Sequence, residues 1–364
     1  MGINRARGAP QVTTANPYRS QPDHAFWKRS VAALLGSEVD PVVEVPFQIG
    51  RSDWIATAGS CFAQHISRTL VELDYRYMVT EPAPAGVGAE LNYGVFPARF
   101  GNIYTVRQLL QTFDRAYGLF RPLDVTWQRS DGALVDPFRP QIQPAGFGAE
   151  AELLADRKHH LACVRAMFEG CDVFIFTLGL TEAWVSSRDG AVFPVAPGVS
   201  GGAFGDDYAF HNLTVAEMTA DLLAFIAKLR AVNPDVRLIF TVSPVALVAT
   251  YESRHVLTAN TYSKAALRVV ADEVVRATPR AAYFPSYEII TGPQARGRYF
   301  ADDLRSVTQD GVAQVMSIFS RHLLADHVEA PQAAAPVASG LDDADQLRFE
   351  QLADVVCEEE ALDP

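Results

Sequence analysis

The sequence predicts one α/β domain with a doubly wound, mostly parallel sheet, helices on both faces and two β-hairpin insertions. Short apolar runs typical of buried strands alternate with longer segments of helical period between residues 54 and 324. The run CDVFIFTLG (171–179) is almost continuously apolar and rich in β-branched and aromatic residues, which is typical of a strand covered on both faces. Two Asp-Gly pairs, at 131–132 and 189–190, lie between alternating segments and predict hairpin tips.

Each element follows from its local pattern. WIATAG (54–59) is a short apolar strand, and the next thirteen residues have the spacing of an amphipathic helix. Thr214 caps a later helix, and Glu217 three residues on completes a capping box. In order, the sequence predicts a strand at 54–59, a helix at 61–73, a short strand at 75–82, a helix at 105–118, a hairpin at 125–137, a helix at 150–168, a strand at 171–179, a hairpin at 183–195, a helix at 214–232, a strand at 236–244, a helix at 258–277, a short strand or strand pair at 281–290 and a helix at 309–324.

The composition predicts three segments in the 364-residue chain. Residues 1–49 form a polar, flexible leader and N-terminal extension without the apolar stretch of a signal peptide. Residues 50–325 form the folded domain. Residues 326–364 combine a Pro/Ala-rich linker with an acidic tail, predicted to be disordered or to contain a short helix around 347–356, and able to dock a protein partner.

Charge and cysteine content exclude several classes of function. The net charge of −12 argues against a nucleic-acid partner, and no apolar run approaches the roughly 20 residues of a membrane span. The four cysteines lack metal-ligand or disulfide-framework spacing, so we expect no metal, no cofactor and a cytoplasmic location.

Unusual polar residues follow the predicted strands, at the edge where ligands bind in open α/β sheets. Helix capping explains one such cluster of polar residues, but four clusters on one edge of the sheet favour a binding or catalytic site. The clusters are Gly59-Ser60-Cys61, Gly179-Leu180-Thr181-Glu182, Ser243 with His255 in the loop that follows, and Asp302-Asp303 with Arg305.

These clusters lie within blocks that resemble the GSCFA-domain family. The blocks are GSCFA (59–63), GNIYTVRQL (101–109), TLGLTEAW (177–184), TVSPV (241–245), YSKAALR (262–268) and FPSYEI (284–289). That family is grouped with the SGNH/GDSL hydrolases, flavodoxin-like proteins that mostly cleave esters. The resemblance therefore implies a flavodoxin-like, SGNH-type fold and suggests ester chemistry.

The resemblance also implies roles for single residues. Ser60 matches the nucleophile, with Cys61 next to it. Gly101, followed by Asn102, or alternatively Gly94, matches the glycine whose N–H binds the oxyanion. Thr181 stands where the oxyanion-binding Asn is expected.

The last block departs from its pattern, Asp-x-x-His. Counting from Asp302 places Arg305 at the histidine position, and counting from Asp303 places Ser306 there. Neither side chain accepts a proton near neutral pH as a general base does.

A relocated base is therefore required if the chain is an enzyme. His255 is the best-placed histidine by sequence, and Glu182 is the next candidate because burial beside Trp184 would raise its pKa. Lys264 is either a solvated charge or an anion contact, and Arg305 either forms a salt bridge or binds a substrate carboxylate or phosphate. Cys61 is the alternative nucleophile.

Two functions remain open at this stage. The first is a serine esterase or acyltransferase acting on a small acyl ester, such as an O-acylated carbohydrate. In it Ser60 attacks, His255 is the base, and Asp302 or Asp303 orients it or contacts substrate. The second is a catalytically degenerate binding protein that recognises an acidic glycan or partner through Arg305 and Lys264.

Overall fold

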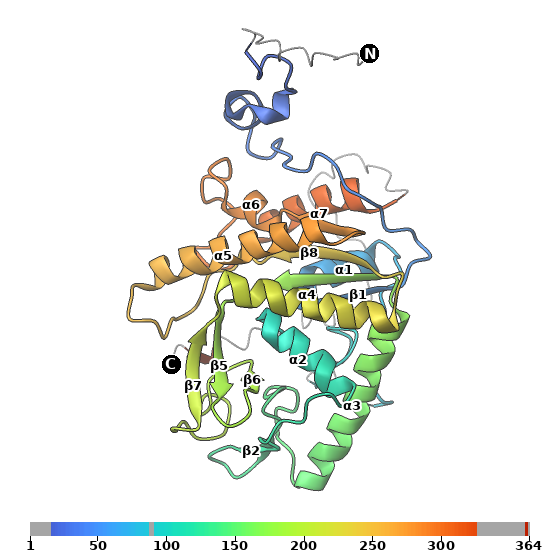
Figure 1. Cartoon of the computed structure of the whole chain (residues 1–364), viewed down its shortest axis with the longest axis vertical. Helices are drawn as coiled ribbons and strands as arrows, with labels where there is room; N and C mark the ends of the chain where they lie inside the picture. The colour runs from blue at the N-terminus through green and yellow to red at the C-terminus, as the bar shows by residue number, and fades with distance from the viewer. Residues whose placement is uncertain (1–15, 87–90, 326–360, 363–364) are drawn as a thin grey trace, which may run out of the picture.

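A computed structural model describes residues 16–86, 91–325 and 361–362. Figure 1 shows helices packed around a central sheet, with smaller β-structures below it. The strands are β1 (Ile55–Gly59), β2 (Trp127–Gln128), β3 (Leu134–Val135), β4 (Val173–Leu178), β5 (Glu182–Ser186), β6 (Val192–Phe193), β7 (Tyr208–Asn212), β8 (Arg237–Val242) and β9 (Ala281–Phe284). The helices are α1 (Ala63–Glu72), α2 (Val106–Ala116), α3 (Glu150–Gly170), α4 (Val215–Val232), α5 (Val256–Ala277), α6 (Ser286–Thr291) and α7 (Gln309–Leu323).

The central sheet confirms the predicted doubly wound α/β fold. Its four strands are all parallel and lie in the order β1-β4-β8-β9. On the outer side of β1, Tyr77 forms a single parallel bridge with Ile55. With that bridge as a reduced second strand, the order is the 2-1-3-4-5 of flavodoxin-like sheets.

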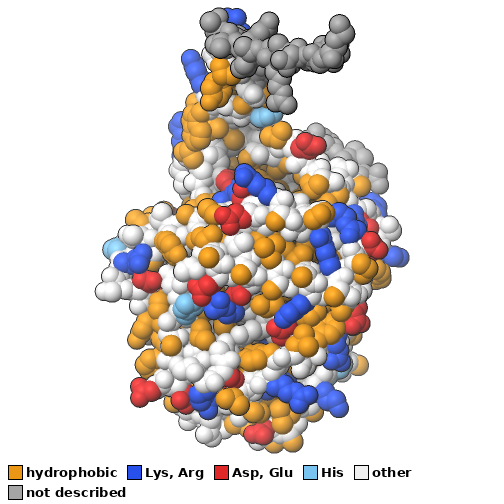
Figure 2. Space-filling view, viewed as in Figure 1, with side chains coloured by type: hydrophobic (Ala, Val, Ile, Leu, Met, Phe, Trp, Pro, Cys, Tyr) orange, Lys and Arg blue, Asp and Glu red, His pale blue; other side chains and the backbone are white. Residues whose placement is uncertain are grey.

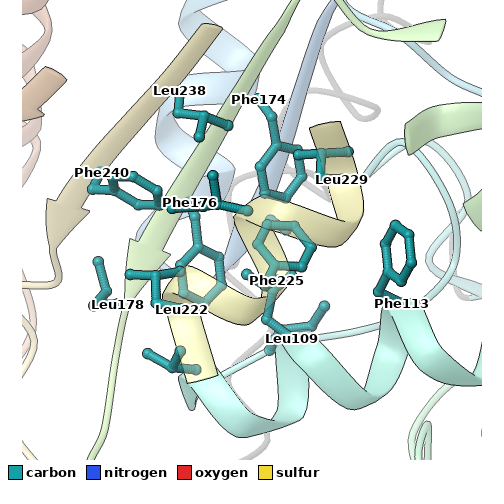
Figure 3. Packing of buried hydrophobic residues seen from close by; sticks show 14 of the residues in the cluster. Leu109, Phe113, Phe174, Phe176, Leu178, Leu222, Phe225, Leu229, Leu238 and Phe240 are labelled. Atoms are coloured by element: carbon teal, nitrogen blue, oxygen red, sulfur yellow. The ribbon is translucent and has the colours of Figure 1, made fainter. Parts of the chain in front are cut away.

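Alternating strand residues separate two cores on the two faces of this sheet. Phe174, Phe176 and Phe240 point to one face, where α2, α4 and α5 supply side chains such as Leu109 and Phe225 (Figure 3). On the other face, Ile55, Ile175 and Ile239 belong to a second cluster with residues of α1 and α7. Apolar side chains on both faces explain why the strands are nearly continuous hydrophobic runs.

Both predicted hairpins are confirmed, and one of them gains a third strand. The pairs β2–β3 and β5–β6 enclose the two Asp-Gly turns. β7 pairs with the other edge of β5 and completes an antiparallel sheet in the order β6-β5-β7. The sequence YAFHN alternates weakly, and all but one of its residues are only half-buried, which explains why periodicity did not reveal β7.

Two other predicted elements differ from the structure. The strand predicted at 75–82 is reduced to the bridge of Tyr77, although Met78 N–H still donates to Ile55 O at 2.8 Å. The strand predicted at 281–290 ends at Phe284, and α6 follows after Pro285. A proline without an N–H cannot continue a central ladder but suits a helix start, so the second half of FPSYEII is helical.

The segment before β1 contacts the domain from about residue 37 onward. Ser37 O accepts a hydrogen bond from Gln314 Nε2 of α7, and Asp40 forms ion pairs with Arg321 and His322. Val42, Val45 and Phe47 pack on the cluster that includes residues of α1 and α7. Ile49 is fully buried and bridges Leu324, with its N–H 2.7 Å from Leu323 O. Further upstream, the short helices η1 (Asp23–Ala25) and η2 (Lys28–Ala32) bury no side chain. In Figure 1 these two short helices project away from the rest of the molecule. Figure 2 shows hydrophobic side chains on the projecting part.

The predicted limits of the folded domain, 50 and 325, stay predictions, and the contacts of Ser37 and Asp40 with α7 lie upstream of the first limit. The expected helix at 347–356 lies outside the described residues. Among the helices of the described residues, none is both long and apolar enough to cross a membrane.

Candidate functional site

A glycine forces the turn that follows β1. Gly59 has a φ of +136°, and a Cβ there would lie 2.3 Å from Thr177 O. Only glycine tolerates that conformation and contact. The turn places Ser60 at the carboxyl end of β1, where its side chain is only 3% exposed.

A second tight approach presses the end of β4 against Ser60. A Cβ on Gly179 would lie 3.0 Å from Ser60 Cβ and 3.2 Å from Tyr104 O. The N–H groups of Gly179 and Leu180 both donate to Tyr104 O, at 3.1 and 3.0 Å. The neighbouring Ile103 N–H donates to Gly59 O at 2.8 Å, so the 103–104 segment joins the ends of both strands.

Gly101 and Asn102 precede this joining segment. Gly101 has a φ of +69°, which suits glycine, and Asn102 is 1% exposed. The Asn102 carbonyl accepts a hydrogen bond from Gln108 Nε2, and the Gln108 side chain also accepts from Tyr104 N–H. The GNIY block therefore lies at the same sheet edge as Ser60, as the resemblance implied.

Two main-chain N–H groups at this edge have partners within the fold. Ser60 N–H donates to Thr177 O at 3.1 Å, and Thr181 N–H donates to Ser263 Oγ at 3.2 Å. Ser60 N–H is therefore not available to bind an oxyanion in this structure, because the parallel ladder between β1 and β4 extends through it.

Three buried hydroxyls at this edge have no hydrogen-bond partner among the described residues. They are Ser60 Oγ, Thr177 Oγ1 and Thr181 Oγ1. Thr177 and Thr181 are fully buried. Buried hydroxyls are normally hydrogen-bonded, so their grouping indicates a place where a bound polar group or water completes the set.

A buried lysine of α5, Lys264, contacts the turn after β4. Its side chain is 1% exposed, and Nζ donates to Gly179 O at 2.8 Å. It lies in the third turn of α5, and because its side chain is buried the alternative of a solvated charge is wrong. The preceding Ser263 holds Thr181, so two consecutive α5 residues bind the 179–181 turn.

Cys61 and Ser243 are also buried at this edge. Cys61 is 5% exposed and lies two residues before the start of α1. Ser243 N–H donates to Leu178 O at 2.8 Å, and its Oγ accepts from Val245 N–H at 3.3 Å. Ser243 therefore stabilises the turn after β8.

His255 serves as the N-cap of α5. Its Nδ1 accepts the Leu257 N–H at 3.1 Å, and its side chain is exposed. In a neutral imidazole the proton then sits on Nε2, and the single acceptor nitrogen is already used. This contact competes with the general-base role predicted for His255.

Glu182 is held at the start of β5 by two donors. Thr250 Oγ1 donates to Oε1 at 2.6 Å and Tyr251 N–H to Oε2 at 3.3 Å. Burial raises the pKa of Glu182, in the direction expected from its sequence neighbours, and the two hydrogen bonds act against that rise.

The loop between α6 and α7 closes on itself. Asp303 accepts hydrogen bonds from Ser306 Oγ at 2.5 Å and from the N–H groups of Arg305 and Ser306, both at 2.9 Å. The Ser306 hydroxyl in particular holds the pKa of Asp303 below its usual range. Asp302 is exposed beside it.

Arg305 connects this loop to the edge of the sheet. Its Nε donates to Ala246 O at 3.0 Å, in the segment after β8. Counted from Asp303, Ser306 stands at the histidine position of the last block, and its hydroxyl donates to the carboxylate that would orient an imidazole.

A pocket of about 350 Å³ opens next to these turns, and the sequence revealed only part of it. Leu180 and Leu247 line it, and both pack with Tyr104 in one apolar cluster. Trp184, Phe210 and Tyr251 supply its aromatic wall. Of the residues of this wall, the sequence pointed only to Trp184, next to Glu182. Phe210 lies in β7 and Tyr251 in a loop, so the sequence did not connect them with the pocket.

Ser60 lines neither this pocket nor the second large pocket of the described residues, between α1 and α7. Within the same described part of the chain, no group of three or more His, Cys, Asp or Glu could hold a metal ion. The site thus consists of a rigid serine turn, buried hydroxyls and a buried lysine.

The family follows from comparison with known proteins. The GSCFA family model matches residues 54–319. The chain belongs to the GSCFA family. The match begins at the strand that ends in Gly59 and extends through most of α7, so it covers every candidate site residue.

The comparisons with curated proteins and with solved structures are less informative. No curated protein matches the chain. Among solved structures, a mutant acetyl esterase with an acetate ion is 11% identical with a TM-score of 0.31, covering 74% of this chain and 95% of that chain. An acetyl xylan esterase from the rumen bacterium Butyrivibrio proteoclasticus is 12% identical with a TM-score of 0.23, covering 66% of this chain and 56% of that chain. We base no inference on similarity at this level.

Proposed function

We propose that this GSCFA-family chain is an esterase-like hydrolase of small acyl esters with Ser60 as its nucleophile. The observation that carries the proposal is the buried Ser60 Oγ without a hydrogen-bond partner, held on a glycine-dependent turn. A hydroxyl left unpaired in the interior costs stability, and function is a common reason for such a cost.

Two further hydroxyls suit the charge that develops during acyl transfer. In the proposed reaction Ser60 Oγ forms a bond to the acyl carbon, and the carbonyl oxygen becomes an oxyanion. Thr181 Oγ1, buried and without a partner, is the proposed donor to that oxyanion. It replaces the asparagine amide that the family resemblance led us to expect.

Lys264 is the proposed base, because His255 already uses its acceptor nitrogen. Lysine in its unprotonated form takes this role in Ser–Lys variants of the catalytic triad. Its Nζ binds the carbonyl of Gly179, the residue that packs on Ser60. In the proposed cycle Lys264 takes the Ser60 proton and passes it to the departing alcohol as the ester C–O bond breaks.

Water then attacks the acyl-Ser60 intermediate and releases the acid, which regenerates the serine. An alcohol in place of water would make the same intermediate an acyltransferase. The tight packing of Gly179 on Ser60 favours a small acyl group such as acetyl. An O-acylated carbohydrate remains our proposed natural substrate class and a cytoplasmic location our proposed setting.

A binding protein is the second candidate, and one observation favours it. Asp303 is bound by Ser306 and by two main-chain N–H groups, so its carboxylate orients no imidazole. A protein of this kind would bind an acyl ester or acidic glycan at the same edge without cleaving it.

Labelling with a fluorophosphonate probe separates the two functions. An enzyme should be labelled at Ser60, and Ser60→Ala should lose both labelling and hydrolysis of p-nitrophenyl acetate. Cys61→Ala is the matched control at the next position and should keep both. Absence of labelling in a folded wild-type chain, with acetylated oligosaccharide still bound, would establish the binding protein instead.

Three variants test the base. Lys264→Met, which preserves the length of the side chain, should reduce kcat by about 100-fold or more, the range that general-base catalysis supplies. His255→Ala should leave kcat unchanged. Circular dichroism must show that Lys264→Met is folded, and Lys264→Arg, which keeps the donor to Gly179 but not the base, should be equally inactive. Full activity in Lys264→Arg would refute the assignment.

A further inference from the structure

The pocket next to β5 has an aromatic wall that reaches the surface. Trp184 lies in edge contact with Phe204, Phe210 and Tyr251, with ring centroids 5.3, 5.9 and 4.8 Å away. Phe204 is 58% exposed and Tyr251 63% exposed. Large aromatic side chains gathered at an exposed hollow are typical of a binding surface.

One residue from the far end of the sequence lies in this pocket. Leu362 belongs to the lining of the pocket, and it is separated by more than a hundred residues from every other lining residue. Its side chain is half-buried, whereas that of the neighbouring Ala361 is exposed. In Figure 1 the C-terminus lies beside β5 and β7.

We propose that this pocket is the docking site of the chain's own C-terminal segment, with Leu362 as the anchor. An aliphatic side chain fits an opening whose walls are Trp184, Phe210 and Leu247, because their apolar surface is removed from water together. The exposed side chain of Ala361 shows that the contact is specific to one position.

The charge of the segment fits a single apolar anchor rather than deep burial. Glu358, Glu359 and Glu360 precede it and Asp363 follows it, so carboxylates flank Leu362 on both sides. Charged groups remain hydrated at a surface, and only the leucine gains from entering the pocket. Within the last seven residues, Leu362 is thus the one large apolar residue among the carboxylates.

The docking site borders the candidate active edge without including it. Leu180 and Leu247 line the pocket and pack with Tyr104, whose carbonyl binds Gly179 N–H. The docked segment therefore lies one residue layer from the turn that packs on Ser60. The proposal stands independently of the proposed hydrolase function, since neither its evidence nor its test involves Ser60.

Hydrogen exchange on the full chain tests the docking. Leu362→Asp places a charge in the pocket and should release the segment, so amides of 204–212 and 247–251 should exchange about tenfold faster, as expected for losing one buried leucine contact. Ala361→Asp adds the same charge at the exposed neighbouring position and should leave exchange unchanged. Equal exchange in the two variants and the wild type would overturn the proposal.

A peptide experiment gives a second, independent measurement. The fluorescent heptapeptide EEEALDP, residues 358–364, should bind the full-length Leu362→Asp protein, whose pocket is open, and should bind the wild type at least tenfold more weakly. Adding Trp184→Ala to Leu362→Asp should remove that binding. Peptide binding that survives Trp184→Ala would place the segment elsewhere. Wild-type exchange protection that grows with protein concentration would assign the contact to a second copy and refute the intramolecular docking.

Discussion

The turn after β1 and the loop before α7 carry the first and last blocks of the family, but they are held in different ways. The first is determined by the main chain: Gly59 adopts a φ that suits only glycine, and Ser60 N–H donates to Thr177 O. The second is determined by side chains, because Asp303 accepts bonds from Ser306 Oγ and two neighbouring N–H groups. The geometry for a nucleophile is therefore preserved, while the acid of the usual triad is bound within its own loop.

The turn after β1 and the loop before α7 should therefore differ in how many substitutions they tolerate. A glycine-dependent turn inside a parallel ladder tolerates few substitutions, because every alternative side chain meets main-chain atoms. The loop before α7 tolerates more, since Ser306 is exposed and can be replaced without disturbing the core. Four experiments test the contrast, in order of decreasing expected effect.

Restoring histidine at position 306 should have the largest effect. Ser306→His removes the hydroxyl that binds Asp303 and supplies an imidazole in the Asp-x-x-His pattern. In a Lys264→Met background, which lacks the proposed base, we expect kcat for p-nitrophenyl acetate to rise about 100-fold, the lower end of what general-base catalysis provides. Ser306→Ala also frees Asp303 but supplies no base, so it should show no gain. Equal rates for the two variants would mean that position 306 does not reach the reacting atoms.

Gly59→Ala should destabilise the fold more than any substitution at a loop glycine. Its Cβ would lie 2.3 Å from Thr177 O at an unfavourable φ, so we expect a loss of about 3 kcal/mol or more in the free energy of unfolding. The control is Gly132→Ala in the β2–β3 hairpin, where φ is +87° but no atom lies within 4 Å. That variant should lose only about 1 kcal/mol from backbone strain. Urea unfolding measures both, and similar losses would show that the close contact relaxes.

His255→Ala should affect stability and not catalysis. The variant loses the side-chain acceptor for Leu257 N–H, so we expect about 1 kcal/mol less stability in urea unfolding, the usual cost of a lost N-cap. His255→Asn keeps an acceptor at the cap and should recover most of that loss. A large fall in kcat for both variants at unchanged stability would return the base role to His255.

Acid should loosen the loop but leave the serine turn intact. The lowered pKa of Asp303 means that the folded chain favours its carboxylate, so this stabilisation is complete above the unfolded value of about 3.9 and is lost as pH falls through the folded value. Hydrogen exchange of the Arg305 and Ser306 amides, corrected for intrinsic rates, should lose protection over that window. Ser306→Ala should shift the loss to higher pH. Ser60 N–H, bound to a main-chain carbonyl, should stay protected, and a parallel loss at Ser60 would indicate general unfolding.

Local sequence signals account for most of the architecture. Apolar runs, capping residues and Asp-Gly turns predicted the central strands, all six longer helices to within two residues at each end and both hairpins, because these depend on neighbours within a few positions. The strand predicted at 75–82 and the second half of 281–290 were wrong for a tertiary reason. Tyr77 pairs through one bridge only at the edge of the sheet, and Pro285 ends β9 and begins α6.

The sequence by itself determined the order of strands and helices, the glycine turn before Ser60, and the resemblance to the GSCFA family that the family match confirms. Only the tertiary structure decided which polar groups meet. It buries Lys264 on Gly179, uses His255 as a helix cap, leaves the hydroxyls of Ser60 and Thr181 without partners and places Leu362 in an aromatic pocket. The reason is physical: periodicity and turn chemistry act over a few residues, whereas these contacts join segments that only the packed sheet brings together.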